Sequence, residues 1–339
     1  MRKNKLIITY PYLSICISAF NMEKYIKKNI MSIINQSYQD FEIIVVDDNS
    51  NDKTEKILKK IQKEENRIII IQHSQNLGVY KSRIESILKA KGKYIMLMDP
   101  DDMYLNENIF KELYKYNSKL NLDIIEFSVY RQIEKAKILF YPDNHFQNHY
   151  HGFKSGIIYQ PELSSLLYIS PNNNQYSHTI CRNIWNKLIR KDIYLKMHNY
   201  IGEDYYNEYI ITADDICMNV ISYHFAHNYS NINLPGYLYN IREISMSHGK
   251  WDISIIITRS INYLLYFNVF YKYLKDFNKD RNYLFYEMNN LNKFLLNIKD
   301  YNVTKYIKRT KDFINQLIKD EHSTEIFKKY LNNLLQYFS

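Results

Sequence analysis

Short apolar runs alternate with helical patterns over the first 130 residues of the chain. Four such runs are rich in β-branched residues and predict buried strands at 12–20, 41–46, 67–72 and 93–98. Between the first two runs, Ile26, Ile30 and Ile33 fall at the spacing of an amphipathic helix, and similar patterns follow the next two runs. Strands buried on both faces and joined by single helices are typical of βαβ units. We therefore predict an α/β fold in which helices flank a mostly parallel central sheet.

The pattern changes twice beyond residue 130. Residues 131–175 are polar and rich in His and Asn, which predicts a loop, and an ordered pattern returns over 176–250. From 251 to 339, Leu, Tyr, Phe and Lys recur at helical spacing without any Pro or Gly. We therefore divide the chain into 1–130 and 131–250, two parts of one domain, and a helical C-terminal extension over 251–339.

The composition is that of a globular protein, with 46% hydrophobic and 24% charged residues. The net charge is +9, but the lysines are scattered among other residues, so we expect no nucleic-acid partner. The cysteines lie far apart without a CxxC pair, which favours a reducing compartment. The N-terminal apolar run is too short for a signal peptide, and no window of about 18 apolar residues predicts a membrane span. We therefore expect a cytoplasmic protein.

A polar cluster follows each of the four predicted strands. In chain order the clusters read SAFN, DDNSND, HSQNLG and DPDD. Ligands of open parallel sheets bind at the carboxyl ends of the strands. We therefore predict that the four clusters form one site.

Three carboxylates follow the fourth predicted strand, at Asp99, Asp101 and Asp102. Asp is strongly preferred at helix N-termini, so these acids could cap a helix that begins near Asn106. Carboxylate oxygens are also the ligands that Mg²⁺ and Mn²⁺ prefer. Taken alone, the segment is compatible with both interpretations.

The DDNSND segment brings two further acids to the end of the second predicted strand. Asp52 and Glu55 have the spacing of a capping box, which explains Asp52 but leaves Asp47 and Asp48. A carboxylate in that position can accept a hydrogen bond from a base N–H or a ribose hydroxyl. The segment is therefore compatible with contact to a nucleotide.

Together these segments resemble the family 2 inverting glycosyltransferases of the GT-A fold. SAFNMEKY, VVDDNSND, NLGVYKSR and AKGKYIMLMDPDD follow, in order, the family patterns P-x-Y-N-x-E-x-Y, VDDGS-x-D, N-x-G-x-x-x-A-R and G-x-Y-I-x-x-L-D-x-D-D. The resemblance covers residues 12–105 and continues more weakly to about 250. The chain departs from the patterns at Ala19, Phe20, Ser82, Ile84 and Ser86. These departures concern the base and the sugar of the donor.

The resemblance implies a Rossmann-like GT-A domain whose 1–130 part binds a nucleotide sugar, with UDP as the nucleotide. The residues that it places at the donor are Ala19, Phe20, Asn21, Glu23, Asp47, Asp48, Asn76, Arg83, Asp99 and Asp101. In this interpretation Asp47 or Asp48 holds the uracil or its ribose, and Asp99 touches the ribose. Asp101 coordinates Mn²⁺ or Mg²⁺ on the diphosphate as part of a DXD motif, and Asp99 and His248 are further candidate metal ligands.

An inverting transfer needs a general base that takes the proton of the acceptor hydroxyl. The resemblance implies that this base, in the acceptor-binding part over 131–250, is the Asp of an acidic pair that opens a helix. Two pairs are available, Glu203–Asp204 and Asp214–Asp215. A helix, a strand and then Arg242 follow Asp215 in the order of the family, so we choose Asp215, with Asp214 in the place of the family's Glu. The alternative is that both acids only cap the helix.

Three weaker signals have simpler explanations. His145, His149 and His151 are interpreted as solvated loop histidines, because a zinc site has tighter spacing. Trp185 lies in a Trp-Asn-Lys-Leu segment that the family shares, and it either stacks on an acceptor sugar or packs in the core. The extension over 251–339 is either a packed helical appendage or an interfacial helix on an anionic membrane, which would suit a lipid-linked acceptor.

We therefore predict a metal-dependent inverting glycosyltransferase of polysaccharide biosynthesis. It would move a sugar from a UDP-linked donor to a hydroxyl of a saccharide or lipid-linked acceptor, in the cytoplasm or peripherally on the inner face of a membrane. A sugar nucleotidyltransferase would need a Gly-rich phosphate loop after the first strand, and SAFNMEKY contains no Gly. The other alternative is a non-catalytic nucleotide-binding scaffold, and the complete set of carboxylates counts against it.

Overall fold

The computed structural model describes the predicted α/β region and the beginning of the C-terminal extension. The described residues are 10–133, 141–142, 156–160, 163, 183–242, 253–277, 315 and 319. The three loop histidines at 145, 149 and 151, the candidate ligand His248 and most of the extension lie outside the described residues.

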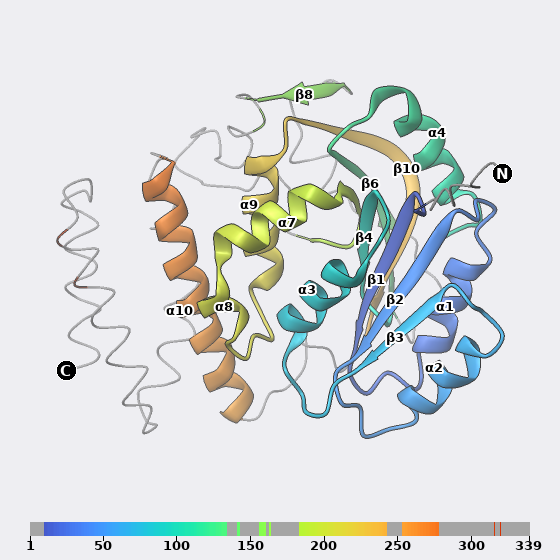
Figure 1. Ribbon diagram of the computed structural model, residues 1–339, viewed down its shortest axis with the longest axis horizontal. Helices are drawn as coiled ribbons and strands as arrows, with labels where there is room; N and C mark the ends of the chain where they lie inside the picture. Colours follow the sequence, from blue (N-terminus) through green and yellow to red (C-terminus); the bar gives the residue numbers. More distant parts are fainter. Residues whose placement is uncertain are drawn as a thin grey trace, which may run out of the picture.

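In the described part of the chain, ten strands form a single sheet (Figure 1). The strands are β1 (Leu13–Ala19), β2 (Phe41–Asp47), β3 (Ile68–Gln72), β4 (Tyr94–Met98), β5 (Met103–Tyr104), β6 (Ile124–Ile133), β7 (Tyr141–Pro142), β8 (Ile157–Tyr159), β9 (Lys187–Arg190) and β10 (Asn228–Ile241). Their order is β3-β2-β1-β4-β9-β6-β10-β5, with β7 beside β6 and β8 beside β10. The four strands predicted from the apolar runs are confirmed as β1 to β4.

The predicted α/β architecture is confirmed, and the sheet is mixed. Strands β1 to β4 are all parallel to their neighbours within this group, so their carboxyl ends and the four polar clusters meet at one edge. In the other half, β9 is antiparallel to both β4 and β6, while β10 is parallel to β6 and antiparallel to β5. Hydrophobic periodicity reports that a strand is buried but not the direction of its partner, so the sequence pattern could not reveal this half.

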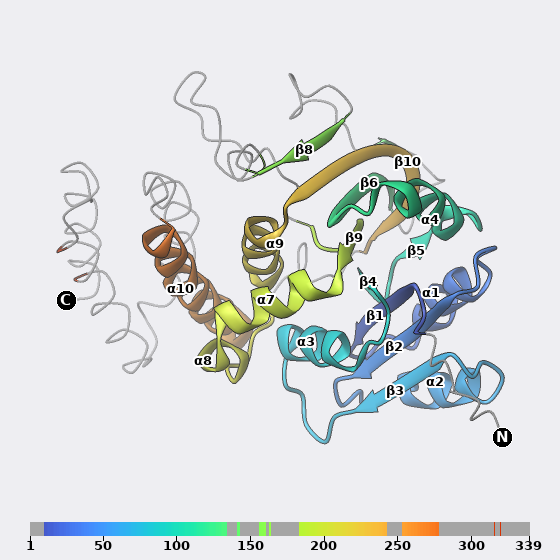
Figure 2. The ribbon, with the colours of Figure 1, turned by 45° about the horizontal axis from the view of Figure 1, so that its top comes forward.

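Helices cover both faces of the sheet (Figures 1 and 2). They are α1 (Ile26–Ile34), α2 (Thr54–Gln62), α3 (Val79–Lys89), α4 (Ile109–Leu120), α7 (Lys191–Ile201), α8 (Glu203–Tyr206), α9 (Asp214–Phe225) and α10 (Ile253–Asp276). Because successive strand residues point to opposite faces, Ile15 and Ile17 of β1 join a core with α1, α2 and α4. Cys16 between them joins the core formed with α3, α7 and α9.

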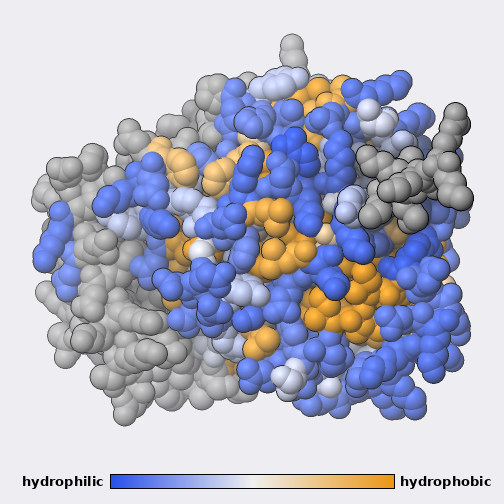
Figure 3. Space-filling model, viewed as in Figure 1, coloured by the Kyte–Doolittle hydropathy of each residue, from blue (hydrophilic) through white to orange (hydrophobic). Residues whose placement is uncertain are grey.

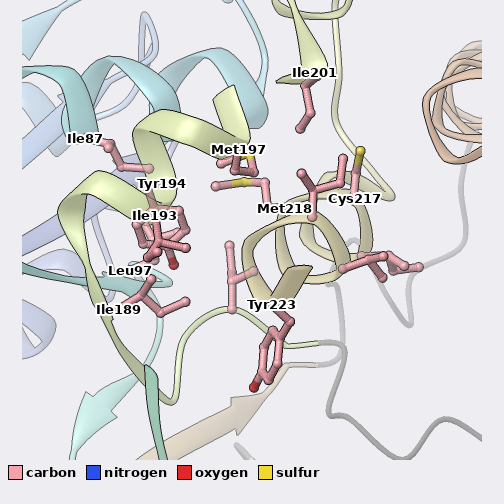
Figure 4. Close-up of a cluster of buried hydrophobic side chains, with 14 of the residues drawn as sticks. Ile87, Leu97, Ile189, Ile193, Tyr194, Met197, Ile201, Cys217, Met218 and Tyr223 are labelled. Atoms are coloured by element: carbon pink, nitrogen blue, oxygen red, sulfur yellow. The ribbon is translucent and has the colours of Figure 1, made fainter. Parts of the chain in front are cut away.

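The second core packs α7 and α9 together behind the acidic edge of the sheet. Met197 of α7 and Met218 of α9 meet between the two helices, and Leu97 of β4 lies beneath α7 (Figure 4). All three side chains are buried. Burial of side chains of this size contributes about 1.5–3 kcal/mol each. This core therefore fixes α9, whose first turn carries Asp214 and Asp215.

The described start of the predicted extension is the helix α10, which packs against α9. Tyr266, Phe270 and Tyr273 of α10 are buried in the same core, and the Tyr273 hydroxyl lies 3.4 Å from Nδ1 of His224 in α9. The predicted helical character is thus confirmed over 253–276. No helix in the described ranges has the length and apolarity needed to cross a membrane.

The edge strand β3 is only partly covered on the α3 face. Helix α3 packs against β1 and β2, and Ile69 and Ile71 of β3 remain half-buried at the margin of that core. Figure 3 shows apolar residues at the surface among hydrophilic ones on this side of the molecule.

Candidate active site

The DPDD segment forms a turn that is fixed from below by α1 and β10. The Asn29 side-chain amide donates to the carbonyl oxygens of both Asp99 and Asp102, at 2.9 Å each. Asp102 is fully buried, and its carboxylate accepts from the Tyr237 hydroxyl at 2.7 Å and from the Asn240 backbone N–H at 2.8 Å. Asp102 therefore anchors β10 beneath the turn.

Capping does not explain the acids of this turn. Helix α4 begins at Ile109 with Asn108 at its N-cap, so Asp101 and Asp102 lie well before the helix. Burial, together with the charge of Asp99, raises the pKa of Asp101 to about 6, although the nearby Arg242 opposes this shift. The turn thus concentrates negative charge that is only partly neutralised.

Arg242 is the cation that faces Asp101. Its Nε lies 2.5 Å from Asp101 Oδ2, and its guanidinium lies over the Tyr25 ring, 5.3 Å from the centroid. The residue follows β10, so the strand that Asp102 anchors also delivers the arginine to the turn. Arg242, which was expected after a helix and a strand that follow Asp215, is therefore brought back to the DPDD turn.

A stack of three aromatic rings supports the same end of β10. Trp185 lies parallel to Tyr237 and Tyr239, with ring centroids 4.6 and 5.3 Å apart. Trp185 is only 7% exposed, so its ring packs in the core, which is one of the two interpretations drawn from the sequence. Tyr237 was missed by the sequence reasoning. Its hydroxyl donates to Asp102 and accepts from the Asp99 N–H at 3.2 Å.

Arg83 connects the DPDD turn to helix α9. Its Nη2 lies 2.8 Å from Asp99 Oδ1, and its Nη1 lies 2.5 Å from Asp214 Oδ2. The Asp99 side chain is 29% exposed and that of Asp214 only 4%. Burial opposes the charge of Arg83, but Asp214 and Asp99 outweigh it and raise the pKa of the guanidinium. One arginine from α3 therefore holds β4 and α9 together.

The two acids that begin α9 have different surroundings. Asp214 is buried against Arg83, whereas Asp215 is half-buried and its Oδ1 accepts from the Ile216 N–H at 2.8 Å. Burial and the neighbouring Asp214 charge raise the pKa of Asp215 to about 6, against the opposing effect of Arg83. The competing pair, Glu203–Asp204, is exposed on α8. Of the two acidic pairs, only Asp214–Asp215 is joined by Arg83 to the DPDD turn, through Asp99.

Asp47 is the last residue of β2, and one of its carboxylate oxygens accepts no hydrogen bond from the described residues. Its Oδ1 accepts from the Ser50 N–H at 3.1 Å, while Oδ2 is buried and accepts no hydrogen bond from the described residues. Ala19 is buried at the end of the neighbouring strand, and Phe20 beyond it is 39% exposed. Asp47 therefore has the free acceptor that a base N–H or a ribose hydroxyl would need.

Asp48 is instead fully occupied by the loop that follows β3. It accepts from the backbone N–H groups of Leu77 and Gly78 at 2.8 and 2.9 Å, and from His73 Nδ1 at 2.7 Å. Asn76 also faces inward in this loop, because its Oδ1 accepts from the Gly78 N–H at 3.2 Å. The structure thus separates two adjacent acids that the sequence could not distinguish, and it adds His73, which the sequence reasoning missed.

Asn21 and Glu23 brace the loop after β1 against the loop after β2. Asn21 adopts a positive φ of 54°; its N–H donates to Ser50 Oγ at 2.9 Å, and its Oδ1 accepts from the Asn51 N–H at 2.8 Å. Glu23 Oε2 accepts from the Lys53 N–H at 3.0 Å. In the described structure these two side chains shape the rim of the site by holding its loops together.

The comparison with protein families agrees with this arrangement. The model of glycosyl transferase family 2 matches residues 14–197, more than half of the chain. The chain therefore belongs to glycosyl transferase family 2.

Individual relatives share parts of the chain. The uncharacterized glycosyltransferase MJ1057 of Methanocaldococcus jannaschii is 37% identical over 131 residues, which are 38% of this chain and 45% of that protein. Glycosyltransferase GlyA of Streptococcus pneumoniae is 24% identical over 319 residues, which are 92% of this chain and 42% of that protein. The chain thus spans less than half the length of these two curated relatives.

Solved structures of S. aureus TarS share the fold. Residues 1–349 of TarS in complex with UDP-GlcNAc match with a TM-score of 0.59 and 20% identity, over 96% of this chain and 86% of that chain. The same part of TarS in complex with UDP matches with a TM-score of 0.57. At this level of identity the likeness supports the predicted GT-A fold.

Proposed function

We propose that the enzyme moves a sugar from a UDP-linked donor to a hydroxyl of a saccharide or lipid-linked acceptor, with inversion at the anomeric carbon. A donor of the UDP class is supported by TarS, which shares the fold and was crystallised with UDP-GlcNAc and with UDP. It is also supported by the spare, buried oxygen of Asp47 at the carboxyl edge of the sheet.

The observation that carries this proposal is the Arg83 bridge. It joins Asp99 to Asp214, the direct neighbour of Asp215. Asp99 lies in the DPDD turn over residues 99–102, which we call the donor turn. An inverting transferase must hold a leaving group and a base on opposite sides of one reacting carbon. The bridge fixes the two elements that would supply them, and the charge of Arg83 lies close to both.

The donor turn has the chemistry to hold Mn²⁺ or Mg²⁺. Asp99 and Asp101 supply hard oxygen ligands, although the described residues contain no group of three or more His, Cys, Asp or Glu placed around one ion. Mg²⁺ is commonly bound by one or two carboxylates together with substrate phosphates. Asp101, whose pKa is raised by burial and by Asp99, would gain from a cation. When bound, the ion would neutralise the charge of the leaving diphosphate.

The residues of the chain can then perform a direct displacement. Asp215 takes the proton of the acceptor hydroxyl, and the acceptor oxygen forms a bond to the anomeric carbon. The bond from that carbon to the diphosphate oxygen breaks, and its electron pair leaves with UDP. Because the attack and the departure occur on opposite faces, the configuration inverts. A base with a pKa of about 6 is ionised at neutral pH and still basic enough to accept the proton as the bond forms.

Two substitutions test the assignment of these roles. Asp215→Asn is expected to slow transfer by about 10²–10⁴-fold while UDP binding, measured by calorimetry, stays unchanged. Asp101→Ala is expected to bind UDP with the same affinity in the presence and absence of Mn²⁺. The wild type should bind UDP more weakly once EDTA has removed the Mn²⁺. Asp204→Asn, on the exposed helix α8, is the matched control and should retain full activity.

Wild-type turnover in the Asp215 variant, or an equal loss in the Asp204 variant, would remove the base assignment. Proton NMR of the product reports the anomeric configuration and so tests inversion directly. A wild-type protein that binds UDP and neither transfers nor hydrolyses UDP-sugars would instead be the non-catalytic scaffold.

A further inference from the structure

A buried histidine lies between two carboxylates beside the donor site. His73 Nδ1 is 2.7 Å from Asp48 Oδ1, and its Nε2 is 2.8 Å from Glu85 Oε2. The residue is 7% exposed. A neutral imidazole carries a proton on only one nitrogen, while an ionised carboxylate can only accept. Both contacts are therefore hydrogen bonds only when His73 is an imidazolium.

This contact controls the loop over residues 73–78. Asp48, which His73 holds, also accepts from the Leu77 and Gly78 N–H groups. On its other side Gly78 forms a β-bridge with Ile210, four residues before α9 begins. The loop therefore connects the end of β2, where the nucleotide is proposed to bind, to the segment that leads into the base helix.

We propose that His73 is a positioning residue of the donor site, which as an imidazolium holds loop 73–78 in place and releases it on deprotonation, so that UDP binding weakens on the alkaline side of neutrality. This inference rests on the proposed function, because it takes the loop to be part of the UDP site. In the described part of the chain, the side-chain partners of His73 are Asp48 and Glu85, and neither is a candidate metal ligand.

Every charged group that packs around His73 is consistent with this role. Asp48 comes from β2 and Glu85 from α3. From α8, the Tyr206 hydroxyl donates to Glu85 Oε1 at 3.3 Å, and Lys81 Nζ lies over the Tyr206 ring at 4.6 Å. Burial lowers the pKa of His73, but the hydrogen bonds and charges of Asp48 and Glu85 outweigh it and raise the pKa above its usual 6.5.

Four other groups near the site have pKa values that are shifted by burial and by their neighbours. Burial and Asp214 set the pKa of Asp215 at about 6, and burial and Asp99 do the same for Asp101, so both acids are ionised above neutrality. Burial and Glu85 raise the pKa of Tyr206 to about 12, and burial and Asp48 raise that of Tyr209 above its usual 10. Between about pH 7 and about pH 9, His73 is the group of this set expected to change charge.

The loop can be observed directly by NMR. Leu77–Gly78 is the only Leu-Gly pair in the sequence, so labelling Leu with ¹³C at the carbonyl and Gly with ¹⁵N yields one carbonyl-to-amide cross-peak. We expect this cross-peak to shift between about pH 7 and about pH 9, together with the ¹³Cε1 signal of His73. A cross-peak that stays fixed while His73 titrates would overturn the inference, whether or not UDP binds.

Two variants with intact backbones connect the loop to UDP binding. In Glu85→Gln, the amide can donate to a neutral His73 while its oxygen still accepts from Tyr206, so no imidazolium is needed. For the wild type we expect the Kd of UDP with Mg²⁺ to rise about tenfold from about pH 7 to about pH 9, which corresponds to losing one hydrogen bond of a charged group. Glu85→Gln should show no such rise, and His73→Gln should bind weakly at both pH values.

The controls separate this inference from the proposed function. His227→Gln removes an exposed histidine and should keep the wild-type pH dependence. Any effect of pH on UDP itself appears in all variants equally. If Glu85→Gln loses affinity with pH as the wild type does, the role of His73 is refuted. If no variant binds UDP at any pH, the proposed donor is wrong, and the NMR cross-peak still decides whether His73 holds the loop.

Discussion

Replacing Asp215 by Asn should inactivate the enzyme and at the same time stabilise its fold. Burial and the adjacent Asp214 raise the pKa of Asp215 from 3.8 to about 6. An acid whose pKa is raised by folding is less easily ionised in the native state than in the unfolded chain. Above both pKa values the ionised Asp215 therefore favours unfolding, and the neutral Asn removes this penalty.

The size of the effect follows from the difference in pKa. A difference of roughly two pKa units at about 1.4 kcal/mol per unit gives an upper bound of about 3 kcal/mol at pH 8. Asp215 is half-buried, so solvent screens part of its charge. We therefore expect Asp215→Asn to raise the free energy of unfolding by about 1–2 kcal/mol. Asn can still accept from the Ile216 N–H through its oxygen, so the substitution keeps that contact.

Urea unfolding at two pH values measures this effect and its sign. The unfolded chain releases the Asp215 proton near pH 4 and the folded protein near pH 6, so the wild type loses stability relative to the variant between these values. The advantage of the variant should be full at about pH 8 and nearly absent at about pH 3.5. Asp204→Asn on the exposed helix α8 should show no gain in stability at either pH value. A less stable Asp215 variant at pH 8, or an advantage that is independent of pH, would falsify the argument.

Two further substitutions test the supports of the site. Gly78 has φ of 91°, and a Cβ there would lie 2.6 Å from the Ile210 carbonyl oxygen, whereas Gly202 has φ of 86° and open space at its Cβ. In urea unfolding, both Ala variants should lose about 1–3 kcal/mol of stability through backbone strain. Only Gly78→Ala should also weaken UDP binding. Equal UDP affinities of the two variants would contradict the role of the loop. In Arg83→Lys a single ammonium cannot span the two carboxylates that the guanidinium contacts. The kcat for sugar transfer should therefore fall about 10- to 100-fold, while UDP binding is retained. A normal kcat would show that the Asp214 contact is dispensable.

Local patterns were sufficient to predict the parallel half of the sheet and the meeting of four polar clusters at one of its edges. The apolar runs at 12–20 and 41–46 correspond to Leu13–Ala19 and Phe41–Asp47, because a strand buried on both faces has to be apolar along its whole length. The helix and strand expected after Asp215 also exist, as α9 and β10. These elements are encoded by residues close together in the chain.

The contacts that complete the site come from residues far apart in the chain, and periodicity carries no information about them. Tyr237 reaches Asp102 across 135 residues, and His73 reaches Asp48 across 25. Nothing in the HSQNLG segment distinguishes a histidine held by two carboxylates from a solvated one. The antiparallel strand β9 was missed for the same reason, because its four residues pair with β4 and with β6, which lie about 60 to 95 residues earlier in the chain.

The structure shows different surroundings for adjacent acids of the site. They occur as three adjacent pairs, Asp47–Asp48, Asp101–Asp102 and Asp214–Asp215. In each pair one carboxylate is held by contacts within the protein, as Asp48 is by loop 73–78, Asp102 by β10 and Asp214 by Arg83. In the proposed function the other carboxylate, Asp47, Asp101 or Asp215, faces a substrate or a cation. Because a fixed neighbouring charge disfavours ionisation, the second acid in such a pair can be kept basic, as Asp214 does for Asp215. Burial and Asp214 raise the pKa of Asp215, whereas burial and Asp99, not Asp102, raise that of Asp101.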